Sequence, residues 1–229
     1  MPSHLRSALS ALGLSLFLAL CGTSASAQQL PAHVQLPAPP SVLLTAPLSV
    51  WRPLLARLDE WLALQAEKVE KPEVQMQLLV QRTLVAQARG DWGGALTSLR
   101  AARLRQTSLV GRHTSGLLNE LLALQAQGQH DAAWLRNETR AAVLAMPWQD
   151  VESSIRGFRQ ALVTMESDGV HRYVAGKMDV ASGLTKGNVD PGFALQLLGL
   201  RFQLEQLLPQ RPALILGLDE AIREREVNR

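Results

Sequence analysis

The sequence predicts an all-α protein, an array of helical hairpins followed by a C-terminal helical bundle segment. Apolar residues recur at intervals of three and four residues over most of the chain, which is the spacing of one helix face. Proline, glycine and aspartate stand where these periodic stretches begin and end. No convincing run of alternating β-branched residues is bounded by turn signals, so we do not expect a sheet.

Residues 1–27 have the layout of a secretory signal peptide. A basic start at Arg6 precedes the apolar run 8–20, and small residues follow up to an Ala-Ser-Ala cleavage signal at 25–27. The apolar run is shorter than the ~20 residues that a membrane-spanning helix needs. We therefore expect cleavage before Gln28, export to the periplasm or the medium, and no transmembrane segment in the mature chain.

The alternative is a lipoprotein, because bacterial lipoproteins are cleaved just before a cysteine that becomes acylated, and Cys21 is the only cysteine. Leu20 stands before it, where such signals carry a small residue, so we favour cleavage before Gln28. A mature chain without cysteine has no disulfide, no thiol catalysis and no Cys-ligated metal. Loss of Arg6 from the 23 basic residues leaves 22 against 20 acidic ones, which argues against a dedicated nucleic-acid binder.

Residues 28–48 are predicted to form a proline-rich extended linker, or a strap that lies on the first helix. The stretch 31–47 contains five prolines and almost no charge. Proline removes a backbone donor and restricts its neighbour, so we expect no regular helix in this stretch.

The region 49–146 is predicted to form five helices. In the first helix Pro53 falls in the first turn, where a proline is tolerated. Its apolar face is formed by Trp51, Leu54, Leu55, Leu58, Trp61 and Leu62. The second helix opens at Pro72 and ends at Gly90, and Gln87 is placed on its solvent face. Its apolar positions are Met76, Leu79, Val80 and Leu84.

The next three helices are marked by their caps and stops. Asp91 caps the third helix, and residues near 114–115 begin the fourth, which stops at Gly128. Asp131 caps the fifth helix, which Pro147 ends. The buried side of the third helix is predicted to be Ala95, Leu96, Leu99 and Ala102.

The C-terminal region, residues 147–229, continues with helical spacing. Apolar residues separated by four, three, four and three positions predict a sixth helix, which Gly169 closes. Residues 170–187 contain three glycines, which weaken a seventh helix there. An N-cap aspartate followed by proline opens the eighth helix; Pro209 ends it and Pro212 opens the ninth.

The stretch 90–102 resembles the second half of a tetratricopeptide repeat. The residues that carry the resemblance are Gly90, Ala95, Leu99 and Ala102. In that family the glycine makes a tight turn and the small residues let paired helices approach closely. A poorer copy begins at Gly128, and Arg82 and Thr83 depart from the family pattern. Over residues 73–146 the resemblance implies TPR-like right-handed helix pairs, and no binding residues are carried over from it.

One concentration of basic residues is a candidate partner-binding face. It is formed by Arg100, Arg103, Arg105 and Arg112. Outside the cytoplasm such a face could meet lipid phosphates, anionic polysaccharide or an acidic protein. The alternative is a plain solvated face, on which Arg103 points to water. Only Trp92 is close enough to stack on bases, so we expect no nucleic-acid partner.

The sequence offers few residues for catalysis or for cofactor binding. Histidines lack a second ligand at metal-binding spacing, and no phosphate-binding glycine loop is present, so we expect no cofactor, metal or catalytic site. Two Glu-Ser pairs, at 152–153 and 166–167, match the dipeptide of lytic transglycosylases, although the glycine-rich segment of that family is missing. The alternative for each is a solvated carboxylate on an amphipathic helix.

The leading functional hypothesis is a non-enzymatic, exported binding or scaffold protein of the periplasm or cell envelope. A groove between its helix pairs would receive a protein partner. The runner-up is a carrier of an apolar ligand, such as a lipid, inside the helical bundle. A murein-acting enzyme is the third hypothesis.

Overall fold

The computed structural model describes residues 34–114, 116–165, 179 and 187–228. These residues form an all-α protein with one short two-stranded ladder. The predicted leader, Gly169 and nearly all of the predicted seventh helix, residues 170–187, lie outside the described residues. No helix among the described residues combines the length and the apolar character needed to cross a membrane.

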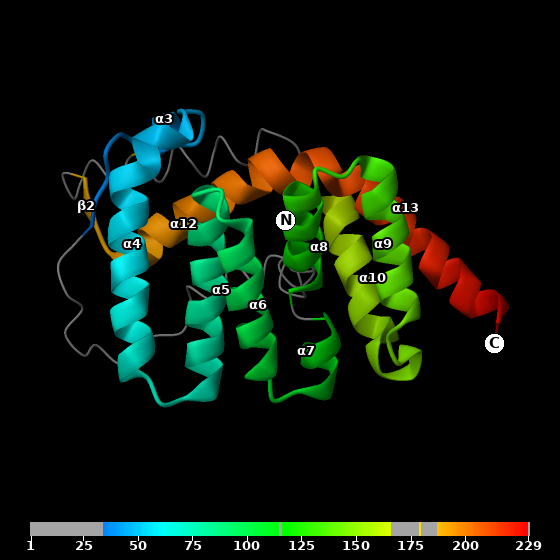
Figure 1. Ribbon diagram of the computed structural model, residues 1–229. Coiled ribbons are helices and arrows are strands. Elements are labelled where there is room, and N and C mark those ends of the chain that lie inside the picture. Colours follow the sequence, from blue (N-terminus) through cyan, green and yellow to red (C-terminus); the bar gives the residue numbers. More distant parts are fainter. Residues whose placement is uncertain (1–33, 115, 166–178, 180–186, 229) are drawn as a thin grey trace, which may run out of the picture.

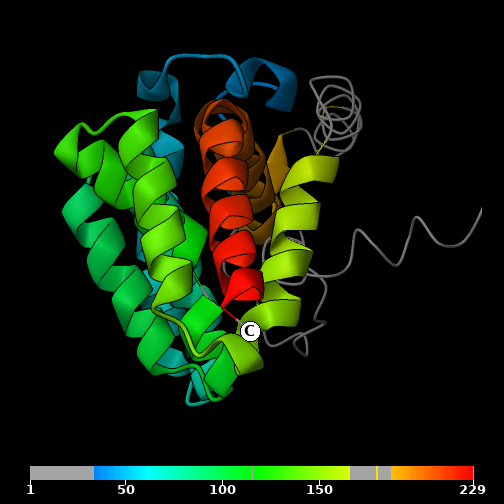
Figure 2. The same ribbon diagram turned by 90° about the vertical axis from the view of Figure 1, so that its right-hand side faces the viewer.

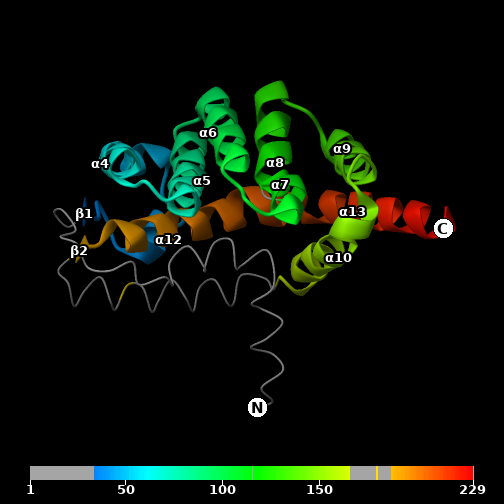
Figure 3. The ribbon, with the colours of Figure 1, turned by 90° about the horizontal axis from the view of Figure 1, so that it is seen from below.

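Six helices follow one another as a row (Figure 1). They are α4 (Leu48–Lys68), α5 (Pro72–Ala88), α6 (Trp92–Leu104), α7 (Leu109–Thr114), α8 (Leu117–Gly128) and α9 (Ala132–Leu144). Helix α5 packs against both α4 and α6, and α8 packs against α6 and α9. Helix α10 (Trp148–Thr164) follows α9 and lies outside the row (Figure 3).

The C-terminal helices form one rod that runs along the row, across the axes of its helices (Figure 1). The rod consists of α12 (Pro191–Phe202), the π-helical turn η1 (Gln203–Leu207) and α13 (Leu208–Val227). Helix α12 packs on α4 and α5, and α13 lies between α9 and α10 (Figures 2 and 3). Within the predicted C-terminal region, the described residues 147–165 and 187–228 therefore share one hydrophobic core with the row. The rod therefore covers one side of the row, where it packs on α4, α5 and α9.

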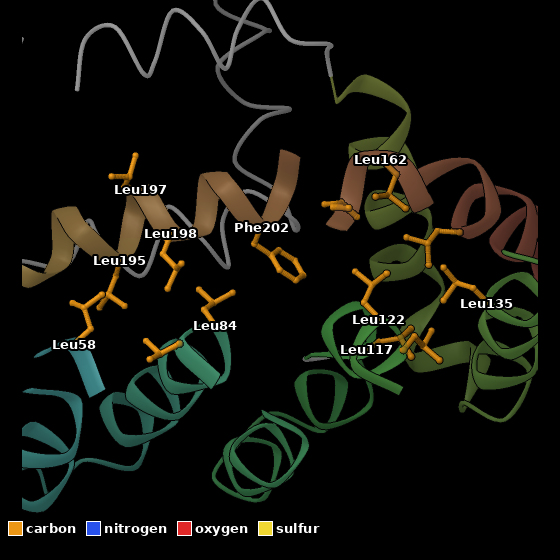
Figure 4. Packing of buried hydrophobic residues seen from close by; sticks show 14 of the residues in the cluster. Leu58, Leu84, Leu117, Leu122, Leu135, Leu162, Leu195, Leu197, Leu198 and Phe202 are labelled. Atoms are coloured by element: carbon orange, nitrogen blue, oxygen red, sulfur yellow. The ribbon is translucent and has the colours of Figure 1, made fainter. Parts of the chain in front are cut away.

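Leucines of the row and of the rod form this core (Figure 4). Leu58 of α4 and Leu84 of α5 face the side of α12 that carries Leu195 and Leu198. Farther along the chain the cluster continues through Leu117, Leu122, Leu135 and Leu162. Burial of such side chains contributes ~1.5–3 kcal/mol each and holds the rod against the row.

The predicted helix starts are confirmed where an aspartate was expected to cap. The carboxylate of Asp91 accepts a hydrogen bond from the Gly94 backbone N–H at 2.9 Å, and Asp131 accepts one from Trp134 at 2.8 Å. Asp190 caps α12 in the same way. The predicted buried side of α6 is also confirmed residue by residue.

The two C-terminal prolines do not end or open helices, so that prediction is wrong. Pro209 lies in the first turn of α13 and Pro212 lies inside it. The π-helical turn η1 ends two residues before Pro209, and hydrogen bonds in a π turn span five residues instead of four. This wider turn accommodates the missing proline donor, and buried Leu207 and Leu214 keep the rod on the core.

The segment before α4 is a strap and not a free linker. It contains β1 (Val34–Gln35), which pairs with β2 (Asn188–Val189), and a short helix, α3 (Pro40–Leu43). The prediction that no helix forms between 31 and 47 is wrong, because Pro40 stands in the first turn, where its missing donor costs nothing. Nor was this two-residue ladder expected. Both Leu43 and Val34 are buried, which fixes the strap to the core.

Candidate functional site

The predicted basic face is partly neutralised by Glu120 of α8. Glu120 has a side chain that is only 16% exposed. It forms an ion pair with Arg103 and lies 3.6 Å from the Nε of Arg100. The assignment of Arg103 to solvent is wrong, because its side chain reaches across to α8 and also donates to the carbonyl of Arg112. Sequence reasoning missed Glu120, since periodicity within α6 does not report what α8 presents to it.

The fourth arginine of that set also has a partner. The Nε of Arg105 donates to the Gln75 side chain at 3.0 Å, which links the end of α6 to the start of α5. The structure therefore brings Arg100 and Arg103 together at one carboxylate. Arg112 contributes its backbone carbonyl to Arg103, and Arg105 lies apart. These contacts join helices of the row and reduce the positive charge of the surface.

The Glu-Ser candidates and the histidines do not gather into a site among the described residues. Glu152 accepts a hydrogen bond from Arg156 one turn later on α10, at 3.0 Å, and the second Glu-Ser pair lies outside the described residues. His130 stacks on Trp134 with 4.3 Å between ring centroids. Within the described ranges no three His, Cys, Asp or Glu side chains lie close enough to hold a metal ion.

A charged hollow of about 500 Å³ between α10 and α13 is held by ion pairs. Arg159 forms a two-pronged hydrogen bond with Asp219, and Arg156 pairs with Glu226. The hydrogen bond that Arg159 donates to Asp219 is the main cause of the raised pKa of Arg159, and the negative charge of Asp219 raises this pKa further. These arginines tie α10 to α13, so the hollow is explained by packing.

A larger groove of about 670 Å³ opens at one end of the row. It is formed by the start of α4, the turn between α5 and α6, and η1. Apolar lining comes from Leu48, Leu55, Ala56, Ala88 and Trp92, and charged lining comes from Arg52, Asp59, Glu60 and Arg89. The Nη1 of Arg89 lies 3.2 Å from Asp59, which joins the end of α5 to α4. Two acidic and two basic residues leave this groove without a net charge.

Local turn chemistry positions the two apolar residues at its rim. Gly90 has a φ of 75°, a left-handed conformation that ends α5, and the Asp91 cap then starts α6 with Trp92 as its first residue. Leu48 is the first residue of α4 and stays 43% exposed. Both side chains therefore stand at helix starts, where the groove opens to solvent.

A recess of about 40 Å³ adjoins this groove. Five residues line both hollows: Leu48, Gln87, Ala88, Trp92 and Gln206. Its further walls are Leu84, Leu198, Arg201, Phe202 and Glu205. The recess is thus an apolar chamber between α5 and the rod, with Gln87, Gln206, Arg201 and Glu205 as its polar lining.

Gln87 is the unusual member of this lining. It is only 6% exposed, and neither its Nε2 nor its Oε1 has a hydrogen-bond partner in the described part of the chain. Its predicted place on a solvent face is wrong, because the rod crosses α5 on a second side and buries it. A buried amide without partners costs about 1–3 kcal/mol. This cost calls for an explanation other than packing.

Arg201 is buried beside it and nearly satisfied. Its Nη1 donates to the carbonyl oxygen of Leu43 at 2.7 Å, and its Nη2 lies 2.7 Å from Glu205. Its Nε has no partner among the described residues. The ion pair with Glu205 balances the charge of the guanidinium, so the recess offers unpaired hydrogen-bonding groups without net charge.

The groove and recess can bind a neutral group that both donates and accepts hydrogen bonds, flanked by apolar surface. Sequence reasoning missed the site, because its residues come from five separate elements, α4, α5, α6, α12 and η1, and form no motif. Comparisons with protein-family models, with curated proteins and with solved structures found no match for this chain.

Proposed function

We propose that this chain is an exported, non-enzymatic binding or scaffold protein of the periplasm or cell envelope, which docks a protein partner in the groove between α4, the α5–α6 turn and η1. The observation that carries the proposal is the amide of buried Gln87 beside this groove, which has no hydrogen-bond partner among the described residues. An internal group that costs stability and has no partner within the fold is suited to pair with a ligand.

The composition of the groove favours a protein partner over a lipid. Exposed Leu48 and half-buried Trp92 supply apolar surface at the rim, and tryptophan is enriched where interfaces are energetically strongest. Charged residues of both signs surround them, as in the polar rim of a protein interface. An acyl chain would gain nothing from Arg52 or Glu60, whereas a peptide can pair with both.

The location of the groove differs from the one that the repeat resemblance implies. The rod lies along the row and packs on α4, α5 and α9, so this face of the row is taken by the chain itself. The groove at the α5–α6 turn lies at the end of the hairpin that carries Gly90. A partner would therefore meet helix ends and η1.

Export is supported by the Ala-Ser-Ala signal at 25–27.

Site-specific photocrosslinking in the native envelope tests this proposal. A photoreactive residue is placed at Leu48 or Ala56, which line the groove, and as matched controls at half-exposed Leu64 and Leu216, which do not. We expect the same protein to be captured from both groove positions and not from the controls, and the capture to be lost in the Trp92→Ala variant. Equal capture from all four positions refutes the groove. Co-purified lipid without a protein adduct favours the carrier alternative.

A further inference from the structure

In the described part of the chain, the recess beside the groove has hydrogen-bonding groups of two kinds without partners, an amide and a guanidinium N–H. Gln87 offers both N–H donors and a carbonyl acceptor, all without partners among the described residues. Arg201 adds one unpaired Nε–H donor. Both residues line the recess, and Gln87 also lines the groove that leads to it.

The pairing rules of amides narrow the choice of ligand. In a primary amide one N–H and the carbonyl lie on the same edge, so two primary amides can pair through two hydrogen bonds. A trans peptide bond holds its N–H and C=O on opposite sides and cannot make both bonds to one side chain. The Gln87 amide is therefore complementary to another primary carboxamide.

The size of the recess fits that group. Its 40 Å³ compares with about 10–15 Å³ for one water-sized sphere, so it has room for roughly three. A carboxamide has three heavy atoms. Leu84, Leu198 and Phe202 would cover the methylene groups that carry it.

The charge of the recess favours a neutral group. Arg201 is paired with Glu205 at 2.7 Å, so a carboxylate entering the recess would face Glu205 and an ammonium would face Arg201. Either charge would lose hydration without a free counterion. A carboxamide avoids that cost, and its carbonyl has a second lone pair that can accept from the Nε–H of Arg201.

From these observations we infer that the recess takes the side-chain carboxamide of an asparagine or glutamine carried by the partner. The inference rests on the proposed function of the groove and specifies what the groove selects. The apolar rim, Leu48 and Trp92, would contact the residues beside that side chain. Selection would then depend on one uncharged polar side chain of the partner.

Three capped amino acids test the inference by NMR of the ¹⁵N-labelled full chain. They are N-acetyl-glutamine N-methylamide and the corresponding glutamate and methionine compounds, which share one backbone. We expect the glutamine compound to shift the NMR signals of the Gln87 side chain and the Trp92 indole. Its affinity should exceed that of the glutamate and methionine compounds by about tenfold or more, which corresponds to one good hydrogen bond. Equal shifts with all three compounds would mean that the protein binds their shared peptide groups and does not distinguish the side chains. No shift with any compound would mean that the recess does not bind a carboxamide. Either result refutes the inference.

Two buried glutamines form a matched pair of variants. Gln125 is 7% exposed, like Gln87, but its Nε2 donates to the Asp131 carbonyl and to Gln210, both at 3.3 Å. Gln87→Met should keep or raise the melting temperature and abolish the preference for the glutamine compound. Gln125→Met should lower the melting temperature and keep the preference. If Gln87→Met melts as low as Gln125→Met, or keeps the preference, the inference is wrong.

These results separate the inference from the proposed function. The small compounds report on the recess without any macromolecular partner, whereas crosslinking from Leu48 reports on the groove. Position-specific capture of a protein together with no response to the glutamine compound would refute carboxamide selection and leave the docking groove in place. A response without any capture would refute the protein partner alone.

Discussion

The guanidinium of Arg201 lies over the indole ring of Trp51, with 5.3 Å between its carbon and the ring centroid. Both side chains donate to one oxygen, the carbonyl of Leu43, at 2.7 and 2.8 Å. Leu43 ends helix α3, so its carbonyl has no partner in a further helical turn. One buried arginine of the rod thus holds the strap and α4 together. This contact explains how the strap and the rod, which are far apart in the sequence, share a core.

Arg201→Met should therefore destabilise the protein. The change removes a charged hydrogen bond to Leu43 and the cation–π contact with Trp51. Since Trp51 still satisfies Leu43 and Glu205 can reach water, we expect a loss of about 2–3 kcal/mol in the free energy of unfolding, measured with urea. Exposed Arg57→Met is the control and should change it by less than about 0.5 kcal/mol. Equal effects of the two changes would contradict the role given to Arg201.

Gly217 marks a close approach of α13 to α9. A Cβ atom there would overlap the carbonyl oxygen of Arg136 and lie 2.8 Å from the Cβ of Thr139, a fully buried residue. Backbone cannot move aside as a side-chain tip can, so Gly217→Ala should cost about 1–3 kcal/mol. In Gly93 of α6 the nearest atom to an added Cβ is 3.9 Å away, so Gly93→Ala should be neutral or stabilise by up to about 1 kcal/mol. Thermal unfolding of both variants checks the difference in sign.

The sequence predicts those elements best whose buried residues form one stripe and whose ends carry local signals. Helix α6 is such a case, since Asp91 and Gly90 mark its start and its single buried face follows from spacing. Helix α5 is not, because α12, which is distant in the sequence, packs on it in addition to the neighbouring helices α4 and α6. Gln87 was therefore misplaced: periodicity within one helix does not report a second helix that arrives about a hundred residues later. The site depends on that crossing and could not be predicted.

Gly90→Val should destabilise through the backbone alone. No atom lies within 4 Å of an added Cβ at this position, but its φ of 75° is one that a β-branched residue resists. We expect a cost of about 1–3 kcal/mol, and a smaller one for Gly90→Asn, because asparagine tolerates left-handed geometry. Ala95→Leu should cost a similar 1–3 kcal/mol or so for a different reason, since Ala95 is fully buried where α6 packs. Urea unfolding measures all three. A Gly90→Asn variant as unstable as Gly90→Val would contradict a purely conformational effect.

Arg103→Leu should lower stability, unlike a change on a solvated face. Arg103 is paired with Glu120, whose largely buried carboxylate would then keep, among the described residues, only the more distant Arg100. Allowing for the partial exposure of Arg103, we expect a loss of about 1 kcal/mol. Arg100→Leu is the matched control, because that side chain is mostly exposed and lies 3.6 Å from the same carboxylate. It should change the melting temperature little, and a reversed order would contradict the geometry around Glu120.

The ion pair between Glu220 and Arg136 should make stability depend on acidity. The Nε of Arg136 donates to Glu220 at 3.0 Å, and this hydrogen bond is the main cause that holds the pKa of Glu220 below its ordinary value. The charges of Arg136, Arg140 and Arg223 lower the pKa further, and partial desolvation opposes them. Glu220 is thus deprotonated more readily in the folded chain than in the unfolded one.

The sign of the effect follows from this lowered pKa. At neutral pH the carboxylate is charged in both states and the pair contributes to stability. As the pH falls through the ordinary glutamate value of about 4.3, the unfolded chain takes up the proton first, and the contribution is lost as the folded pKa is passed. Glu220→Gln should therefore melt lower than the natural sequence at neutral pH, and the two curves should meet in strong acid. High salt should shrink the gap at neutral pH, because both side chains lie at the surface. As a control, exposed Glu138→Gln should have the melting temperature of the natural sequence at every pH. If the difference in melting temperature between the natural sequence and Glu220→Gln grew as the pH fell, the pairing of α9 and α13 through Glu220 would be contradicted.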